Sequence, residues 1–366
     1  MVAGSLWPFL VAVLAPVIRH ELRLSATDLG IAYASYYLAA SVSSYPAGRL
    51  VDALTLRVSA AVLCLSACAQ VLVLSWATNL TMLVCSGVVG GLSLGLANPV
   101  TNAAIASHIH TRHVRWMVGL KQAGVPLAAI LAGWVLPRLA DVPGWRVAVA
   151  GAVVIPLSTV AFARRLDARP GRSRENTAPP RGTTRLVWYA LLLGGVTAGV
   201  NGYLALYVVD VLDGSLASAG TAVVGLAASG AAGRVGWMGL AGALPMPMLL
   251  RALAVGGTLA LLVLAGTSHP LAVGAAVATL GLTVLSWLSL GMVAVVTGHS
   301  SRVGEGSGRV LRAFYGGFVI GSPLVGIVID QAGFRSAWVL LAGLSALAAL
   351  VCGPAPRVPS GRGSAP

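Results

Sequence analysis

Charged side chains are scarce in this sequence. Asp, Glu, Lys and Arg together make up 9% of its 366 residues, whereas hydrophobic residues make up 57%. A soluble globular domain has about 25% charged and about 45–50% apolar residues. The mean hydropathy of +0.87 departs from a soluble composition in the same direction. These values exclude a water-soluble globule and predict an integral membrane protein in contact with a lipid bilayer.

Cysteine and lysine are also few, and a nucleotide-binding loop is missing. The four cysteines all lie in apolar stretches, where a free cysteine behaves as a small hydrophobe, so we expect no disulfide framework. His108, His110 and His113 lie near two arginines without carboxylate or thiolate partners, and we interpret them as a solvated loop. No Gly-x-x-x-x-Gly-Lys-(Ser/Thr) segment is present to bind a phosphate. We therefore expect no metal site and no cofactor.

Long apolar runs fill most of the chain. A hydrocarbon core about 30 Å thick needs roughly 20 apolar residues per crossing. The run from Met1 to Ile18 has no charged side chain and lacks the basic start of a secretory signal peptide. We interpret it as a retained first helix, before which the sequence is clipped or its start misassigned. The expected helices span residues 2–18, 28–50, 58–76, 79–104, 116–138, 145–163, 186–209, 216–238, 249–267, 270–296, 309–329 and 336–352.

A polar segment at 164–185 divides these helices into six and six. It holds seven arginines and three prolines and has too little apolar content to fold alone. We predict an N-terminal six-helix bundle at 1–163 and a C-terminal bundle at 186–352. Residues 353–366 are expected to form a disordered tail.

The arginines predict the orientation in the membrane. The formal net charge is +14, but the arginines lie in short segments between apolar runs, which is not the pattern of a nucleic-acid-binding surface. With both termini and the segment 164–185 on one side, that side collects eighteen arginines and the other side five. Positive charge gathers in cytoplasmic loops. We therefore expect a multi-pass protein of the cell membrane with a cytoplasmic central loop and cytoplasmic termini.

An internal repeat supports two related halves. Asp141-Val-Pro-Gly144-Trp-Arg precedes and opens the sixth expected helix, and Asp330-Gln-Ala-Gly333-Phe-Arg does the same for the twelfth, 189 positions later. The same offset places the fifth helix, from Gly119, on the eleventh. Both of those helices are rich in glycine and contain a proline. The sequence thus predicts two homologous bundles in parallel order.

The turn after the second helix carries a family resemblance. The segment from Gly48 to Arg57 resembles the loop motif Gly-x-x-x-Asp-(Arg/Lys)-x-Gly-x-(Arg/Lys) of the major facilitator superfamily, with Gly48, Asp52 and Arg57 matching and Ala53 and Thr55 departing. The resemblance implies that Gly48 permits close helix packing. It also implies that Asp52 caps a neighbouring helix and helps to hold the outward-facing state.

The resemblance extends over essentially the whole chain. The second half repeats the motif from Gly233, with glycine where an aspartate is common and with Arg234 as the gating cation, so we expect a lopsided gate. The eleventh helix reads Gly317-x-x-x-Gly321-Ser-Pro323-x-x-Gly326, and small residues of this kind let membrane helices approach closely. The resemblance implies an all-α major facilitator fold of twelve transmembrane helices. It also implies transport by alternating access rather than enzymatic activity.

Alternating access places a solute near the bilayer midplane, so polar residues within helices are candidates for binding it. An Asn or Tyr there is about as often an interhelical contact as a ligand contact. All ten acidic residues lie in expected loops or near helix ends, so no carboxylate for proton coupling is evident at mid-depth. Facilitated diffusion and transport coupled to a proton are both compatible with the sequence. We expect a monomer with a small-molecule solute. The candidate binding residues are Tyr33, Tyr37, Asn98, Asn102, Lys121, Gln122, Asn201, Tyr203 and Trp287.

The fifth helix gives the only indication of substrate class. Its segment Gly119-Leu-Lys121-Gln122-Ala-Gly124-Val-Pro126 is similar to Gly-x-Lys-Gln-x-Gly-x-Pro segments of superfamily members grouped with cyanate and nitroimidazole carriers. It departs from the longer Gly-Pro signature of drug:proton exporters. We therefore expect uptake of a small polar or anionic solute, with Lys121 attracting its negative end. A drug or natural-product exporter, a non-transporting sensor and a membrane enzyme are the alternatives.

Overall fold

The computed structural model describes residues 1–109, 113, 117, 120–140, 144–163, 184–241, 243–298 and 303–352, and within these ranges it contains helices and no strands. A short 3₁₀ turn, η1 (Ala3–Ser5), comes first. The helices of the first half are α1 (Trp7–Leu22), α2 (Ala26–Ala53), α3 (Leu56–Ser75), α4 (Leu80–His108), α6 (Gly124–Ala140), α7 (Trp145–Gly151) and α8 (Val154–Ala163). Those of the second half are α9 (Thr184–Asp210), α10 (Leu216–Leu240), α11 (Met246–Gly266), α12 (Pro270–Leu282), α13 (Trp287–Gly298) and α14 (Val303–Val351).

The expected helices and the observed ones agree closely. Nine helical segments of the described residues are long and apolar enough to cross a membrane. One of these, α14, contains both the eleventh and the twelfth expected helix. The second expected helix is α2, which is richer in serine and tyrosine, and the sixth is the pair α7 and α8. The fold is therefore that of an all-α membrane protein with two six-helix halves.

Parts of the sequence-based interpretation lie outside the described residues. These are His110, Gly119, Asp141, most of the predicted loop at 164–185 and the predicted tail at 353–366.

Glycines at equivalent positions open the last helix of each half. Gly144 has φ of 87° and begins α7, and Gly333 has φ of 76° at the kink within α14. They are 189 positions apart, as the predicted repeat requires. Positive φ at this value suits glycine because it has no Cβ. The conformation shared by the two glycines supports the homology of the two halves.

Side-chain caps explain where several helices begin. At the start of α2, the Ser25 hydroxyl accepts a hydrogen bond from the Asp28 N–H, and the Asp28 carboxylate accepts one from the Ser25 N–H. Asn79 accepts from the third residue of α4, and Thr55 accepts from the third residue of α3. Caps of this kind satisfy N–H groups that a helix leaves without an internal partner.

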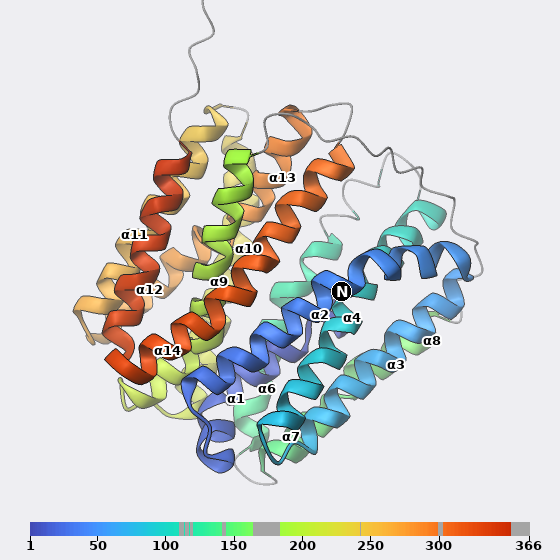
Figure 1. Cartoon of the computed structure of the whole chain (residues 1–366), viewed down its shortest axis with the longest axis horizontal. Helices are drawn as coiled ribbons and strands as arrows, with labels where there is room; N and C mark the ends of the chain where they lie inside the picture. The colour runs from blue at the N-terminus through green and yellow to red at the C-terminus, as the bar shows by residue number, and fades with distance from the viewer. Residues whose placement is uncertain are drawn as a thin grey trace, which may run out of the picture.

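The two halves meet mainly through α1, α2 and α6 on one side and α9, α10 and α14 on the other. In Figure 1, α2 and the first part of α14 lie side by side near the turn that follows α1 and separate toward the other end. We call the end with residues 23–25, 211–215 and Gly333 the closed end. The end with the α2–α3 turn at Leu54 and Thr55 is called the open end. The molecule therefore has a closed and an open end along the expected membrane normal.

Close glycine contacts seal the closed end. A Cβ added to Gly220 of α10 would lie 2.2 Å from the carbonyl oxygen of Gly133 in α6. A Cβ added to Gly326 of α14 would lie 2.5 Å from the carbonyl oxygen of Ala26. Only glycine lets the backbones of the two halves approach this closely. Within the glycine motif of the eleventh helix, Gly326 thus packs against the other half, whereas Gly317 and Gly321 pack against α9 of the same half.

Candidate functional site

A cavity of about 580 Å³ lies between the two halves. Its walls come from α1, α2, α4 and α6 on one side and from α9, α10, α13 and α14 on the other. Both halves contribute polar side chains, as expected for a solute site at their interface. The sequence-predicted residues that line it are Tyr37, Asn98, Asn102, Lys121, Gln122, Asn201 and Arg234.

Two asparagines of α4 hold the ammonium group of Lys121. The Nζ atom donates to the Oδ1 atom of Asn98 at 3.1 Å and to the Oδ1 atom of Asn102 at 2.6 Å. Residues four apart lie on the same face of a helix, so both amides point toward Lys121. The structure thus brings together three residues that the sequence analysis named separately.

The second cation of the cavity, Arg234, comes from α10 in the other half. Its Nε and Nη2 atoms each donate to the carbonyl oxygen of Leu285 at 3.3 Å, and Nη1 donates to the carbonyl oxygen of Gln122 at 3.4 Å. Leu285 lies between α12 and α13, where the helix is interrupted. Arg234 therefore joins the halves across the cavity wall, and its acceptors there are neutral carbonyl groups.

The described part of this wall carries positive charge without negative charge. Among the described residues that line the cavity there is no aspartate and no glutamate, although Lys121 and Arg234 are both present. A charge in a low-dielectric site is costly unless it is paired. The described part of the cavity is therefore electropositive.

Aromatic rings from both halves form the deeper part of the cavity. The ring of Tyr37 in α2 lies 4.0 Å from that of Phe318 and 5.9 Å from that of Tyr315, both in α14, measured between centroids. Phe314 continues the row at 5.0 Å from Phe318. The sequence analysis named Tyr37 but missed the three rings of α14, whose spacing of one, three and four residues was the available signal.

Three candidate residues do not line the cavity. Trp287 is buried between Tyr189 and Phe314, at centroid distances of 5.5 and 5.2 Å. Tyr203 lies toward the closed end, with its hydroxyl 2.9 Å from the carbonyl oxygen of Ala26 and 2.8 Å from that of Ser322. Tyr33 is buried one turn deeper than Tyr37, beside a separate small pocket. Tyr203 thus packs the halves together, and Trp287 packs the second half.

The residues of the loop motif lie on either side of the α2–α3 turn, at the open end. Asp52 and Arg57 are exposed at the open end, and the structure gives Asp52 no hydrogen bond or ion pair within the described residues. A Cβ added to Gly48 would meet no atom within 4 Å. The close packing that the resemblance implies for Gly48 is therefore absent in this conformation.

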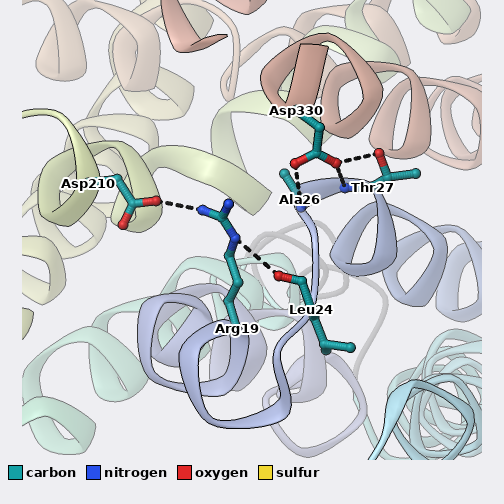
Figure 2. Close-up of polar contacts among 6 residues, drawn as sticks. All are labelled: Arg19, Leu24, Ala26, Thr27, Asp210 and Asp330. Carbon is teal, nitrogen blue, oxygen red and sulfur yellow. Dashed lines mark hydrogen bonds and ion pairs between the residues drawn. The ribbon is translucent and has the colours of Figure 1, made fainter.

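Polar contacts between the halves gather instead at the closed end. Figure 2 shows Arg19 of α1 reaching Asp210 of α9, with Nη1 2.6 Å from Oδ2. It also shows the Asp330 carboxylate at the start of α2, where it accepts from the N–H of Ala26 at 2.9 Å, the N–H of Thr27 at 2.8 Å and the Thr27 hydroxyl at 2.6 Å. Sequence analysis used Asp330 only to define the repeat and did not assign Arg19 or Asp210 to a gate.

Comparisons with known proteins identify a matching family and solved structures of similar fold. A family model described as Major Facilitator Superfamily matches residues 1–310, and no curated protein sequence matches the chain. The nucleoside transporter NupG is similar in structure, with a TM-score of 0.77 and 14% identity over 96% of this chain and 95% of that chain. A bacterial homolog of the human lysosomal transporter Spinster, inward-facing and unoccupied, gives 0.78 and 12% over 96% and 93%.

A third solved structure extends the likeness to a human protein. The human organic anion transporter TETRAN gives a TM-score of 0.67 and 13% identity over 96% of this chain and 97% of that chain. At these identities the structural likeness establishes the fold and not the solute. The family match and the fold agree over most of the chain, and together they show that this protein belongs to the Major Facilitator Superfamily.

Proposed function

We propose that this protein is a secondary or facilitative transporter that carries an organic anion across the membrane by alternating access. The observation that supports it most is the pair of cations, Lys121 and Arg234, in a cavity wall whose described residues include no carboxylate. An anion bound between them would offset the cost of holding two charges away from water, about 2.5–3.5 kcal/mol each on insertion scales.

The asparagines beside Lys121 are arranged to assist such an anion. Their Oδ1 atoms accept from the ammonium group, which fixes the amide orientation and leaves the NH₂ groups free to donate. An anion that reaches Lys121 therefore meets one charged donor and two neutral donors. Hydrogen bonds to charged groups are worth about 1.5–3 kcal/mol each, so this cluster supplies binding energy as well as attraction.

The direction of opening follows from the arginine distribution. The open end carries Arg49 and Arg57, which belong to the side expected in the cytoplasm. On that orientation the closed end faces outward, and the conformation is inward-facing. Asp52 agrees with this state, since it has no partner among the described residues and the family resemblance implies that it caps a helix in the outward-facing state.

The aromatic part of the cavity favours a solute with an organic body. Tyr37, Tyr315 and Phe318 present ring faces and edges, which bind apolar or planar groups. The same lining would also suit an exporter of amphipathic anions. Flux into and out of vesicles of known sidedness distinguishes uptake from export.

A binding test separates charge from shape. The purified protein is heated with benzoate, benzamide or benzylamine at equal concentration, and its melting temperature is measured. A ligand that binds the native state raises its stability once the ligand concentration exceeds Kd. Only benzoate is expected to raise the melting temperature, because only benzoate carries the negative charge that the two cations attract. Arg138→Gln, which removes a cation stacked on Trp134 outside the cavity, serves as the control for Lys121→Gln. Equal stabilisation by benzamide, or by benzoate in the Lys121→Gln variant, would contradict the proposal.

A further inference from the structure

A second, much smaller pocket lies directly below the main cavity, toward the closed end. Its volume is about 10 Å³, close to the least that holds one water oxygen. It lies between α1, α2, α9 and α14 and shares Pro8, Phe9, Tyr37, Asn201 and Phe318 with the main cavity. We call it the floor pocket. Its polar side chains are Tyr33, Tyr37, Asn201 and Ser322.

Two hydroxyl groups at the floor pocket lack a partner. Tyr33 is 3% exposed and Ser322 is 1% exposed, and neither hydroxyl has a hydrogen-bond partner within the described residues. By contrast, the hydroxyls of Tyr36, Tyr189 and Tyr203 all reach backbone carbonyl oxygens. A buried hydroxyl without a partner costs about 1–3 kcal/mol. The arrangement therefore needs an explanation other than packing.

The position of the Tyr33 hydroxyl is fixed by the packing of its ring. The ring meets that of Trp7 edge to face, with centroids 5.9 Å apart at 79°. On the other side it lies against Gly202 of α9, where an added Cβ would come within 3.2 Å of a ring carbon. The ring cannot turn its hydroxyl elsewhere without displacing a helix of the second half. The hydroxyl is held at the pocket.

The floor pocket and the two cations lie at opposite ends of the main cavity. Along α10 the lining extends from Val223 to Arg234, which is eleven residues and about 16 Å at 1.5 Å per residue. Arg234 and Lys121 lie at the upper end, and Asn201, at the lower end, lines both pockets. A solute that contacts both ends must be elongated.

We propose that the floor pocket is a binding subsite for a neutral hydroxyl oxygen of the solute. This inference rests on the proposed transport of an organic anion, and it specifies an elongated anion that carries a hydroxyl far from its charge. Tyr33 and Ser322 each offer a donor and an acceptor, and the Asn201 amide adds a third group. The subsite contacts both halves, so an occupied pocket joins α2 to α9 and α14.

Matched anions test the subsite. Binding of 4′-hydroxybiphenyl-4-carboxylate and biphenyl-4-carboxylate is measured by thermal titration of the purified protein, alongside the short pair 4-hydroxybenzoate and benzoate. The hydroxyl is expected to tighten binding of the long anion about fivefold, the value of one net hydrogen bond. It should give no gain in the short pair, which cannot reach from the cations to the floor pocket.

Variants assign the gain to the pocket. Ser322→Ala and Tyr33→Phe should remove the fivefold difference and leave the affinity for biphenyl-4-carboxylate unchanged. Ser93→Ala is the matched control, because Ser93 of α4 is also a buried, unpartnered serine but lines neither pocket. Equal binding of the two long anions, no binding of either, or a difference that survives in both variants would overturn the subsite.

The same titration keeps this inference distinct from the proposed function. Lys121→Gln should weaken both long anions and leave their ratio unchanged. Binding of benzoate without either biphenyl anion would overturn the subsite and leave anion transport standing. An unchanged affinity for every anion in Lys121→Gln would instead contradict the role of the cation.

Discussion

Arg19 and Asp210 join the two halves at the closed end, with Nη1 of the arginine 2.6 Å from Oδ2 of the aspartate. Arg19 is held in place by a second bond, from its Nε to the carbonyl oxygen of Leu24 at 3.2 Å. Both side chains are about one-third exposed, so the pair is worth about 0.2–1 kcal/mol. A contribution of this size suits a contact that would have to break in each cycle of the proposed alternating access.

Reversing one charge of this pair should destabilise the observed conformation. Arg19→Glu places two carboxylates together and should lower the melting temperature of the purified protein, whereas Arg19→Glu combined with Asp210→Arg should recover part of the loss. Arg335→Glu, at an exposed position of the same end, is the control. A double variant no better than the single one would show that the ion pair does not hold the halves.

Asp330 of α14 caps the start of α2, and Asp52 of α2 occupies the corresponding position relative to the start of α14. Asp330 meets Ala26 where α14 and α2 run antiparallel. Twenty-six residues further along α2 lies Asp52, and twenty-six residues earlier along α14 lies Gly304, in the first turn of that helix. Asp52 would thus reach the start of α14 if the helices closed at the open end. Each aspartate would cap the partner helix in one of the two states.

Cysteine cross-linking tests this exchange of caps. A variant carrying Asp52→Cys and Gly304→Cys should cross-link slowly, because the open end separates these positions. Adding Asp330→Asn should speed the reaction, since the α2 start loses a charged cap worth about 0.5–2 kcal/mol. Asp213→Asn, at the same end, should not. An unchanged rate with Asp330→Asn would remove this cap from the gate.

Close packing of α6 and α10 should require that Gly220 has no side chain. Gly220→Ala forces a Cβ to within 2.2 Å of the Gly133 carbonyl oxygen, and overpacking of this kind costs about 1–3 kcal/mol. Gly225→Ala in the same helix meets no atom within 4 Å and should be neutral or stabilising. Melting temperatures of the two variants give the comparison. Equal values would show that the closed end tolerates separation.

The orientation in the membrane remains a prediction from the arginine count. Reporter fusions at Asn176, in the predicted central loop, and at Asp213, at the closed end, should report opposite sides of the membrane. The Asn176 fusion should be cytoplasmic. Two fusions on one side would contradict the helix order.

The helices were accessible to sequence analysis because hydrophobic length and helix caps are local properties. The starts of α7 and of the last part of α14 followed from a repeat around Gly144 and Gly333. The interruption between α12 and α13 was not predicted, because Thr283 to Ser286 carry no proline or glycine signal.

The site was only partly accessible. Lys121, Asn98 and Asn102 were named as polar residues within helices, and their contact depends on how α4 lies beside the segment that precedes α6. Arg234 was placed at a gate from its motif, but the carbonyl groups that position it in the cavity wall belong to Leu285, at a distant helix break, and to Gln122 of the other half. Arg19 and Asp210 are 191 positions apart, and nothing local in either sequence indicates the other.

Transport by the Lys121→Gln variant tests the central claim most directly. Proteoliposomes with wild-type protein, Lys121→Gln, Lys121→Arg or the control Arg138→Gln are given radiolabelled benzoate, and initial rates are measured over a range of concentrations. Loss of a charge-assisted contact worth about 1.5–3 kcal/mol should raise the half-saturation concentration roughly ten- to hundredfold in Lys121→Gln. Lys121→Arg should keep part of the activity, since its planar fork fits a point-charge site poorly. A wild-type half-saturation concentration in Lys121→Gln would contradict the account of this cavity as an anion site.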